Sequence, residues 1–386
     1  MKNKILYPLP ALFILIIFLS GCLQNEITNP PNQETVQKTE TSTLTPTLLP
    51  SRTFTPNPSP TSTPTPSPTR VPTHPAESVI STIGLSGPIA TPKAQISGMA
   101  WLGETLMILP QYPERLINQS GFPSIFTLSK QEILAYLQDP NPEPLIPKQL
   151  SFQAPELDAQ IKGYEGYEAI AIEGENIFLT VEANDFGTMH GFLISGRINP
   201  AQTEIRLDPA SLKEISLPQQ IINYSYEALV LTGQEVITIY EANGQELNSN
   251  PSAYIVDRVS LESRFINFEP IEYRITDATA LDEEGHFWVM NVFMPIEFWL
   301  YTEADPIFEQ FGRGSTHSTY LNVERMLELE YTENGFALTG REPVQIELVN
   351  ELNSRNWEAL VRLDDLGFLA MTDTYPETIL AFIPFP

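Results

Sequence analysis

One short phrase recurs along this chain, in which an acidic residue and an alanine stand at the start of an apolar run. Each clear copy is followed, a few residues later, by a second apolar run. The acids that open the first runs are Glu168, Glu227, Asp277 and Glu358. The second runs end on Glu182, Glu241, Asn291 and Asp373. A repeat that retains its acid while neighbouring residues change predicts copies of one β unit that converge on a shared axis.

Two weaker copies extend the series to six. Ser97 takes the place of the acid in one of them and Met326 in the other. Successive copies start about 30 to 70 residues apart, which brackets the four-stranded blade of a β-propeller. The sequence therefore predicts an all-β fold, a six-bladed β-propeller. The alternative is an all-β sandwich whose hairpins happen to end in charged turns.

Other segments add strands and one helix to this prediction. Residues 253–256 and 286–290 have the composition of further strands, and residues 129–137 are the best helical candidate. We expect residues 78–90 to supply an outer strand beside residues 378–383. Such a pairing would close the ring by tying the two ends of the domain together.

The N-terminus has the pattern of a bacterial lipoprotein signal peptide over residues 1–22. Lys2 and Lys4 form a basic start, an apolar run continues to Leu19, and small residues precede Cys22. The thiol of Cys22 is then the lipidation site. An uncleaved membrane anchor is the alternative, but the run contains Pro10 and is short for a span of about 20 residues. Either way the remainder is expected to be extracytoplasmic, attached to the membrane at the cell surface.

Composition divides the rest of the chain into two parts. Residues 23–77 are rich in Pro, Thr and Ser, which predicts a disordered, extended tether, with glycans on the hydroxyl groups as an alternative role. Residues 78–386 remain for one large β domain with a full core. Cys22 is the single cysteine, so a disulfide within the chain is excluded.

Charge excludes some partners. The formal net charge is -27, with 48 acidic residues against 21 Lys and Arg. A basic surface for nucleic acid or for anionic lipid headgroups is therefore not expected. An anionic substrate would need local arginines or a bound metal. We expect a monomer whose partners are the membrane, through the lipid on Cys22, and a small-molecule ester or an envelope ligand.

Acids that converge on an axis suggest a cation site. Clusters of oxygen ligands suit a hard cation, Ca²⁺ before Mg²⁺. The candidate metal ligands are Glu168, Glu227, Asp277 and Glu358 at one level, and Glu182, Glu241 and Asp373 at a second level, where Asn291 could add a carbonyl. The alternative is that each acid accepts backbone N–H groups or pairs with an arginine. Arg274 and Arg355, each three residues before its acid, would allow this.

Other catalytic patterns are missing from the sequence. It contains no Gly-x-Ser-x-Gly, no His-Glu-x-x-His and no phosphate-binding glycine loop. His190 is a weak candidate for an acid or base, because it follows the run that ends at Glu182. The more common role of such a histidine is that of an ordinary loop residue, so the catalytic residues stay unassigned.

The repeats resemble those of the phytase-like β-propeller family, also described as the esterase-like activity of phytase domain. The resemblance starts near Gln95 and continues to the C-terminus, and it is carried by residues 97–101, 167–171, 273–278, 356–364, 367–369 and 372–373. It implies calcium at the axis, held by Glu168, Glu227, Asp277 and Glu358, and hydrolysis of phosphoesters or other esters. The chain departs from the family in lacking an Asp-Asp-Pro signature and in having few lysines near the repeats.

Two functions follow from these patterns. The first is a calcium-dependent hydrolase of ester bonds at the cell surface. The second is a non-catalytic lipoprotein whose propeller binds a glycan, a peptide or an envelope partner. The missing nucleophile and the scarcity of basic residues favour the second.

Overall fold

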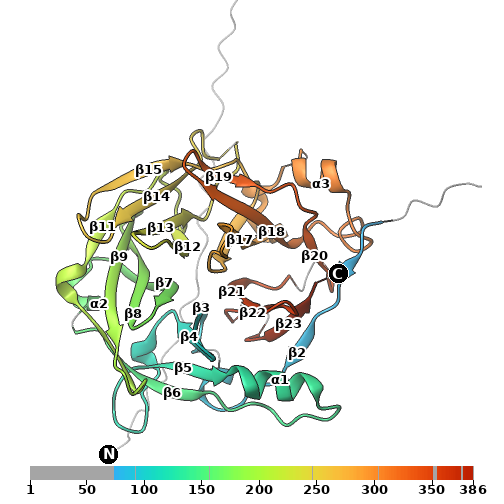
Figure 1. The fold of residues 1–386 in the computed structure, drawn as a ribbon. Helices are drawn as coiled ribbons and strands as arrows, with labels where there is room; N and C mark the ends of the chain where they lie inside the picture. The colour runs from blue at the N-terminus through green and yellow to red at the C-terminus, as the bar shows by residue number, and fades with distance from the viewer. Residues whose placement is uncertain are drawn as a thin grey trace, which may run out of the picture. The chain divides into compact units, whose positions relative to one another are not determined.

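The computed structural model describes residues 74–385, except 92, 156, 246, 303, 351–353 and 375–376. These residues form one compact unit whose regular secondary structure consists mainly of β-strands (Figure 1). The predicted signal peptide, Cys22 and nearly all of the predicted tether lie outside the described residues and stay predictions. None of the helices described is long and apolar enough to cross a membrane.

The strands form antiparallel blades, and each blade begins with the strand nearest the axis of the ring in Figure 1. Blade 1 consists of β3 (Ile96–Leu102), β4 (Thr105–Pro110), β5 (Ser124–Ser129) and β6 (Lys148–Gln153). Blade 2 consists of β7 (Tyr164–Glu173), β8 (Asn176–Asp185), β9 (Thr188–Ile198), β10 (Glu204–Leu207) and β11 (Lys213–Ile215). The outer strands β6 and β10 pair in parallel, so these two blades share one nine-stranded sheet.

The other three blades are separate sheets. Blade 3 consists of β12 (Tyr226–Leu231), β13 (Glu235–Tyr240), β14 (Ser252–Asp257) and β15 (Ser263–Asn267). Blade 4 consists of β16 (Arg274–Ala278), β17 (His286–Phe293), β18 (Val323–Thr332), β19 (Gly335–Leu338), β20 (Val344–Ile346) and β1 (Glu77–Ser78). Blade 5 consists of β21 (Trp357–Leu363), β22 (Gly367–Thr372), β23 (Leu380–Pro384) and β2 (Ser81–Ile83).

The inner strands close a ring of five within the described residues. β3 contacts β7, β7 contacts β12, β12 contacts β16, β16 contacts β21, and β21 returns to β3. The prediction of six blades is therefore wrong, because the described residues form five. The predicted propeller architecture itself is present. The segment around Met326, counted as a blade start, is β18, which pairs with β17 as the third strand of blade 4. The inner strands and β18 all contain apolar runs of similar composition, which is why the sequence pattern could not separate them.

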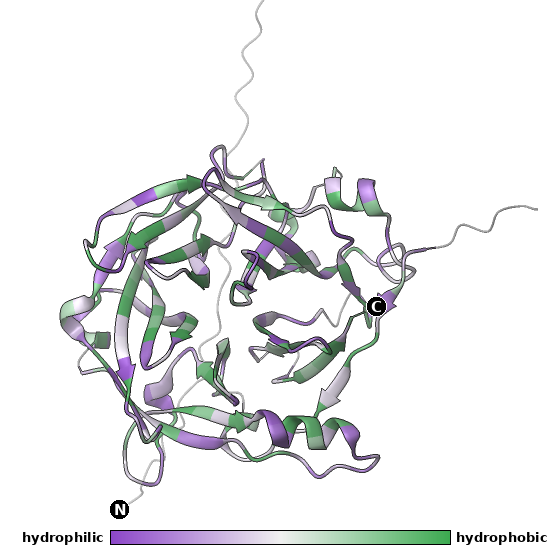
Figure 2. Cartoon of the chain, in the orientation of Figure 1, coloured by the Kyte–Doolittle hydropathy of each residue, from purple (hydrophilic) through white to green (hydrophobic). Residues whose placement is uncertain are grey.

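Five apolar clusters stabilise the ring, and each joins mainly two neighbouring blades. Trp288 and Met326 of blade 4, for example, pack in one cluster with Trp357 and Phe368 of blade 5. Apolar residues run along the strands of every blade in Figure 2. Because the blades pack face to face, most strands are buried on both sides and lose the apolar–polar alternation of a one-sided sheet.

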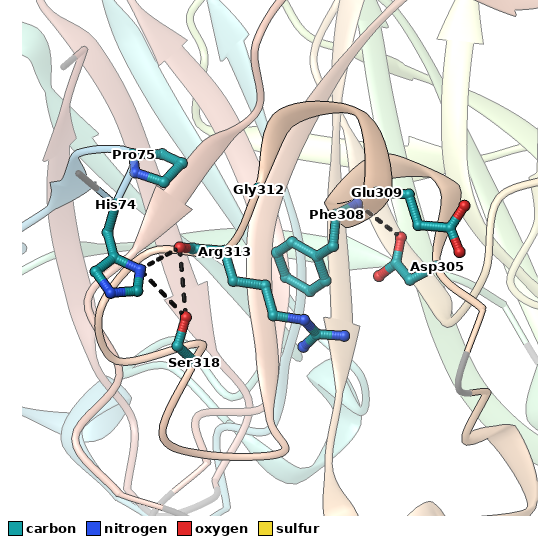
Figure 3. Close-up of a pocket in the computed structure, with 8 residues that line it drawn as sticks. All are labelled: His74, Pro75, Asp305, Phe308, Glu309, Gly312, Arg313 and Ser318. Carbon is teal, nitrogen blue, oxygen red and sulfur yellow. Dashed lines mark hydrogen bonds between the residues drawn. The ribbon is translucent and has the colours of Figure 1, made fainter. Parts of the chain in front are cut away.

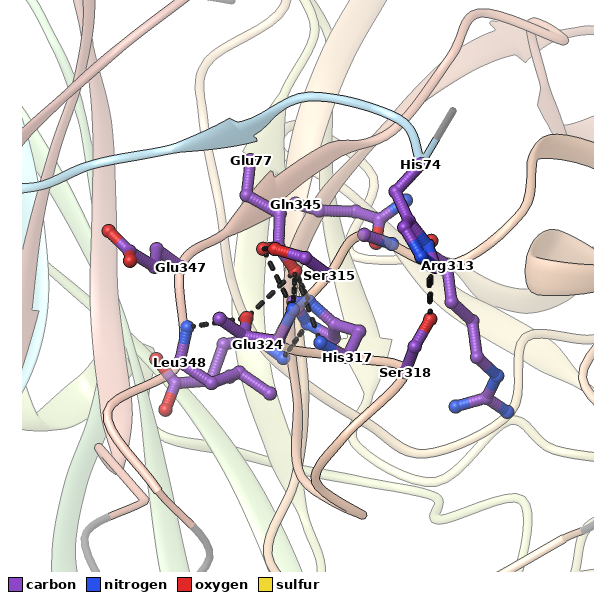
Figure 4. Close-up of polar contacts among 12 residues, drawn as sticks. His74, Glu77, Arg313, Ser315, His317, Ser318, Glu324, Gln345, Glu347 and Leu348 are labelled. Atoms are coloured by element: carbon purple, nitrogen blue, oxygen red, sulfur yellow. Dashed lines mark hydrogen bonds and ion pairs between the residues drawn. The ribbon is translucent and has the colours of Figure 1, made fainter. Parts of the chain in front are cut away.

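The N-terminal strands fasten the ring. β2 pairs antiparallel with β23, with Thr82 opposite Ala381, which confirms the closing strand expected from the sequence. β1 pairs in parallel with β20 of the neighbouring blade. Figure 4 shows how Glu77 of β1 is held by the loop at residues 315–317. Its carboxylate accepts hydrogen bonds from Thr316 N at 3.0 Å, Thr316 Oγ1 at 2.8 Å and His317 Nδ1 at 2.7 Å.

Helices are short and lie between strands. The α-helices are α1 (Lys130–Gln138), α2 (Leu157–Gln160) and α3 (Pro306–Phe311), and the 3₁₀ turns are η1 (Pro88–Ala90), η2 (Pro113–Arg115), η3 (Pro209–Ser211) and η4 (Pro295–Leu300). α1 confirms the helical segment expected at residues 129–137. Ser129 caps it reciprocally with Glu132, satisfying N–H groups of the first turn.

Candidate functional site

A β-bulge interrupts each inner strand near its start. The residues within these bulges are Ser97, Glu168, Glu227, Thr276 and Glu358. A bulge leaves an extra residue unpaired and turns its side chain away from the regular pleat. The repeated phrase of the sequence is therefore the signature of a bulge. In three blades this bulge carries a glutamate towards a common cluster, because the charges of Glu168, Glu227 and Glu358 act on one another.

Blade 4 is offset from this pattern by one residue. Its bulged residue is Thr276, whereas Asp277 takes the next, regularly paired position. The carboxylate of Asp277 consequently joins blades instead of completing the acid cluster. Its two oxygens accept hydrogen bonds from Ala278 N and from Leu360 N of blade 5, each at 2.7 Å. Both oxygens of this predicted calcium ligand already have partners.

An arginine occupies one half of the cluster. Arg274 is 8 % exposed, and its guanidinium bonds to groups from three blades. Its partners are Glu241 through Nε, Glu358 Oε1 at 2.9 Å, Asn356 Oδ1 at 2.9 Å and Glu297 Oε1 at 3.3 Å. Arg274 is thus an internal cation for this half. It pairs with acids of neighbouring segments and not with Asp277, the acid three residues after it.

The other half of the cluster has no such cation. It consists of Glu168 of β7, Glu182 of β8 and Glu227 of β12, and none of the three makes a salt bridge within the described residues. Glu168 Oε1 accepts a hydrogen bond from Gln111 Nε2 at 3.0 Å. Glu182 Oε2 is buried and accepts none from the described residues. Each of these side chains keeps only 6–7 % of its surface exposed.

Burial and mutual repulsion make these carboxyl groups retain their protons. Burial, with the charge of Glu241, raises the pKa of Glu182 to about 8. Burial also raises the pKa of Glu241 to about 8 and that of Glu358 to about 7, although Arg274 lowers both. The pKa values of Glu168 and Glu227 are raised well above the ordinary value, by burial first and by neighbouring acids second. Near pH 7 most of the cluster is therefore neutral.

The spacing of the acids differs from that of a formed metal site. Ligand oxygens around one Ca²⁺ lie at most about 5 Å apart, because each is about 2.4 Å from the ion. Among the described residues, ligand atoms of three side chains come within 4.8 Å only in a partly exposed group, Asp282, Glu284 and His286. No three of the seven predicted ligands meet this spacing. To share an ion, the axial carboxyl groups would have to rotate toward one another.

The remaining predicted residues lie apart from the cluster or are already bonded. Asn291 donates to the carbonyls of Glu272 and Arg274 and accepts from Arg325. Arg355 pairs with Glu324 at 2.7 Å and not with Glu358. Asp373 follows β22 and raises the pKa of Glu358 by its charge, after burial and against Arg274. His190 lies on β9 beside Glu214 at 2.7 Å, in the outer part of blade 2.

Two exposed aromatic side chains follow Glu297, one of the acids bonded to Arg274. η4 carries Glu297, which reaches Arg274, and next to it Phe298 and Trp299, which are 75 % and 51 % exposed. The two rings meet edge to face with centroids 5.4 Å apart, and Trp299 Nε1 donates to Tyr224 Oη at 3.1 Å. The turn η4 thus contributes the Glu297 carboxylate to Arg274 and leaves the rings of Phe298 and Trp299 exposed; these two rings are called the aromatic rim below.

A separate pocket of about 420 Å³ lies beside α3 (Figure 3). Three of its polar side chains, His74, Asp305 and Ser318, are already bonded. His74 Nδ1 contacts Arg313 O at 2.9 Å, and Asp305 caps α3 and pairs with the buried Arg325 at 2.9 Å. These contacts fasten the N-terminal segment and the long connection between β17 and β18, so we assign this pocket a structural role.

No protein-family model and no curated protein matches the chain. Among solved structures, it is similar to a glucose dehydrogenase, with 11 % identity over 80 % of this chain and 99 % of that one and a TM-score of 0.39. The GH43 endo-arabinanase from Bacillus licheniformis has 9 % identity over 78 % and 95 %, with a TM-score of 0.40. A putative glycoside hydrolase from Parabacteroides distasonis has 10 % identity over 75 % and 87 %, with a TM-score of 0.42. These scores assign no activity, and the fold described above rests on the strand pairing.

Sequence reasoning missed Gln111, Glu297, Phe298 and Trp299. Gln111 follows β4, at the place where Glu241 follows β13, so the repeat itself could have indicated it. Glu297 and Trp299 belong to the connection between β17 and β18, which lies outside the repeat. Nothing in their spacing connects them to the axis.

Proposed function

We propose that the axial cluster binds a neutral, hydroxyl-rich ligand and that the protein is a carbohydrate-binding propeller of the cell envelope. The observation that carries this proposal is a set of buried carboxyl groups, whose pKa values burial raises, together with two exposed aromatic rings on the turn that carries Glu297. A protonated carboxyl group both donates and accepts hydrogen bonds, as sugar hydroxyl groups do. The rings of Phe298 and Trp299 offer flat apolar surfaces to the ring faces of a sugar.

Charge supports a neutral ligand. With a net charge of -27 the protein repels anions over a long range. Arg274, which is the one buried cation of the site among the described residues, is already bonded to three carboxyl groups and an amide. A phosphorylated ligand would therefore find no free positive partner in this half of the cluster.

Calorimetry with the purified full-length chain tests this proposal, using a panel of neutral oligosaccharides of pentoses and hexoses. We expect at least one to bind, and Trp299→Ala to weaken that binding at least ten-fold. Phe265→Ala is the matched control, because Phe265 is an exposed aromatic residue on the outermost strand of blade 3. Absence of binding across the panel, or equal affinity in Trp299→Ala, would contradict the proposal.

A second candidate function is the ester hydrolase implied by the phytase-like resemblance. It is favoured by one observation: the pKa of Glu358 is raised to about 7 and that of Glu182 to about 8, values suited to a general acid at neutral pH. Calcium, if held by rotated carboxyl groups, would polarise the ester and its attacking water. Release of phosphate from phytate, and cleavage of an aryl phosphate and an aryl ester, with calcium and with chelator, decide the matter. Glu227→Gln with Glu358→Gln should abolish such turnover, and unchanged turnover in this variant would exclude the role.

We also propose that a lipid on Cys22 attaches the protein to the outer side of a membrane, with residues 23–77 as a tether. The support is the sequence pattern before Cys22. We expect Cys22→Ser to leave the membrane fraction, as measured by cell fractionation. Retention there would argue for an uncleaved anchor.

A further inference from the structure

A second cavity lies on the same axis, beyond the acid cluster. It measures about 380 Å³, and all five inner strands line it. Along each inner strand the motif acid, or Ser97 in β3, precedes the residues that line the cavity, and the turn after β16 completes the lining. Ile172 is four residues beyond Glu168 along β7, a distance of about 13 Å at the rise of a strand. The lining residues are Met99–Trp101, Ile170–Glu173, Leu229, Leu231, Ala278–Asp282, Val361 and Arg362.

The walls of this cavity are apolar. Most of the lining side chains are Ile, Leu, Val, Met, Ala and Trp. Leu229, Ala278 and Val361 are at least 94 % buried in the fold and present their apolar surfaces here. The size lies in the range of small-molecule sites, about 300–1,000 Å³. It is too small for a helix or a protein loop of ordinary length.

The charged groups at the mouth are already paired. Arg362 Nη1 lies 4.0 Å from Asp282 Oδ2, and Arg362 Nη2 lies 3.3 Å from Asp365 Oδ1. Glu173 is hydrogen-bonded to Arg258. No lining carboxylate or guanidinium of the described residues is thus left without an opposite charge. A charged ligand would have to displace one of these pairs, whereas a neutral ligand would not.

Hydrogen-bonding groups are nevertheless available along the walls. Each inner strand is the terminal strand of its blade, so one backbone edge faces the axis without a partner strand among the described residues. Trp101 is fixed at the mouth because its Nε1 donates to Arg362 O at 2.8 Å. The cavity therefore combines a fixed aromatic ring, apolar walls and a few backbone donors and acceptors, which is the usual composition of a small-molecule site.

We propose that this cavity binds a neutral, apolar small molecule with a ring or a short hydrocarbon chain. Its body packs against Ile170, Leu229 and Val361, and a single polar group meets the strand edges near Trp101. The site is separate from the axial cluster. Asp277 lies between the two, because it bonds to Leu360 N while the next residue, Ala278, already lines the cavity. This inference does not depend on the carbohydrate proposal.

The test uses N-phenyl-1-naphthylamine, a neutral apolar dye that fluoresces on leaving water, with the full-length chain. We expect saturable binding of one dye per chain. Ala278→Leu and, independently, Ala171→Leu add volume to the lining and should each weaken binding at least ten-fold. Ala159→Leu, on the exposed surface of α2, is the matched control. Two substitutions are used so that, if one variant fails to fold, the other still tests the proposal. Circular dichroism verifies the fold of each variant.

Trp299→Ala separates this cavity from the aromatic rim at the acid cluster. Unchanged dye binding in Trp299→Ala, with loss in the two cavity variants, supports the proposal. Loss in Trp299→Ala with full binding in the cavity variants would overturn it, because the dye would then occupy the rim. Binding that never saturates would overturn it as well.

Discussion

The two ends of the propeller axis are built from the same five strands and differ in chemistry. At the acid end, where the inner strands begin, bulges direct three glutamates into one cluster, and one of them, Glu358, bonds to Arg274. At the apolar end, where these strands finish, regular pairing leaves apolar side chains around a cavity of about 380 Å³. A shift of a few residues along one strand thus changes a polar, proton-retaining site into an apolar one. The difference lies in backbone geometry as much as in composition.

The connections between strands also differ in length between the two ends of the axis. At the acid end the chain makes long excursions, such as residues 111–123 between β4 and β5 and residues 294–322 between β17 and β18. At the apolar end inner strands pass to their neighbours through short turns, such as residues 103–104, 174–175 and 364–366. Long loops supply additional groups, here Gln111, Glu297 and Trp299, whereas short turns leave the strands to define the cavity alone.

We expect the largest loss of stability from a substitution at the acid end. Arg274→Met removes the only cation bonded to Glu241, Glu297 and Glu358 within the described residues, and leaves buried acids without compensation. Loss of one partner of a buried ion network costs about 3–5 kcal/mol. We expect a decrease of that size in the free energy of unfolding, measured by urea denaturation at pH 7.

The apolar end supplies the matched control. Arg362→Met removes a cation whose side chain is about one-third exposed and which pairs with the partly exposed Asp282 and the exposed Asp365. Such a pair contributes at most about 1 kcal/mol. If the two variants lost equal stability, the contrast in burial between the ends would not govern their energetics.

A smaller effect concerns pH. The pKa values of Glu182 and Glu241 are raised to about 8 and that of Glu358 to about 7, whereas the unfolded chain releases these protons near 4.5. The folded state therefore binds more protons between these values, and stability should fall as pH rises from about 4.5 to about 8. We expect the melting temperature to drop by a few degrees over this range. Glu182→Gln should flatten the profile.

Two controls sharpen the pH experiment. Glu262→Gln, at an exposed turn outside the axis, should leave the slope unchanged. The pKa of Glu77 is shifted in the opposite direction. Burial would raise its pKa, but hydrogen bonds from His317 and Thr316 lower it to about 2, so its contribution is lost only as pH falls from about 4.5 toward 2. A melting temperature that rose steadily from pH 5 to pH 8 would contradict the protonated cluster.

Much of the architecture could be predicted from the sequence because the repeat marks a backbone feature. The acid–alanine phrase falls at or beside a bulge in every blade that has it, and the strand at β2 and the helix at α1 follow from ordinary local signals. The number of blades could not be predicted in the same way. Met326 opens an apolar run as inner strands do, and only its pairing with β17 reveals it as a third strand.

The site was harder to predict, since its members are set by register and by loops. Asp277 matches the motif by residue type, but the bulge in blade 4 falls on Thr276, so the carboxylate moves to a regular position and bonds to β21. Arg274 is three residues before an acid in sequence, yet its partners come from blades 3 and 5 and from η4. Periodicity reports the spacing within a strand and carries no information on which blades meet at the axis.

The two N-terminal strands determine how the domain meets a pulling force. Tension applied at residue 74 acts first on β1, which pairs in parallel with β20, and on Glu77 with its hydrogen-bond donors. Only after these contacts yield does the force reach β2, whose pairing with β23 closes the ring. The contacts of β1 with blade 4 thus bear the load before the closing pair in blade 5 does. A pull from the N-terminal side would detach a short strand from blade 4 before it could open the propeller.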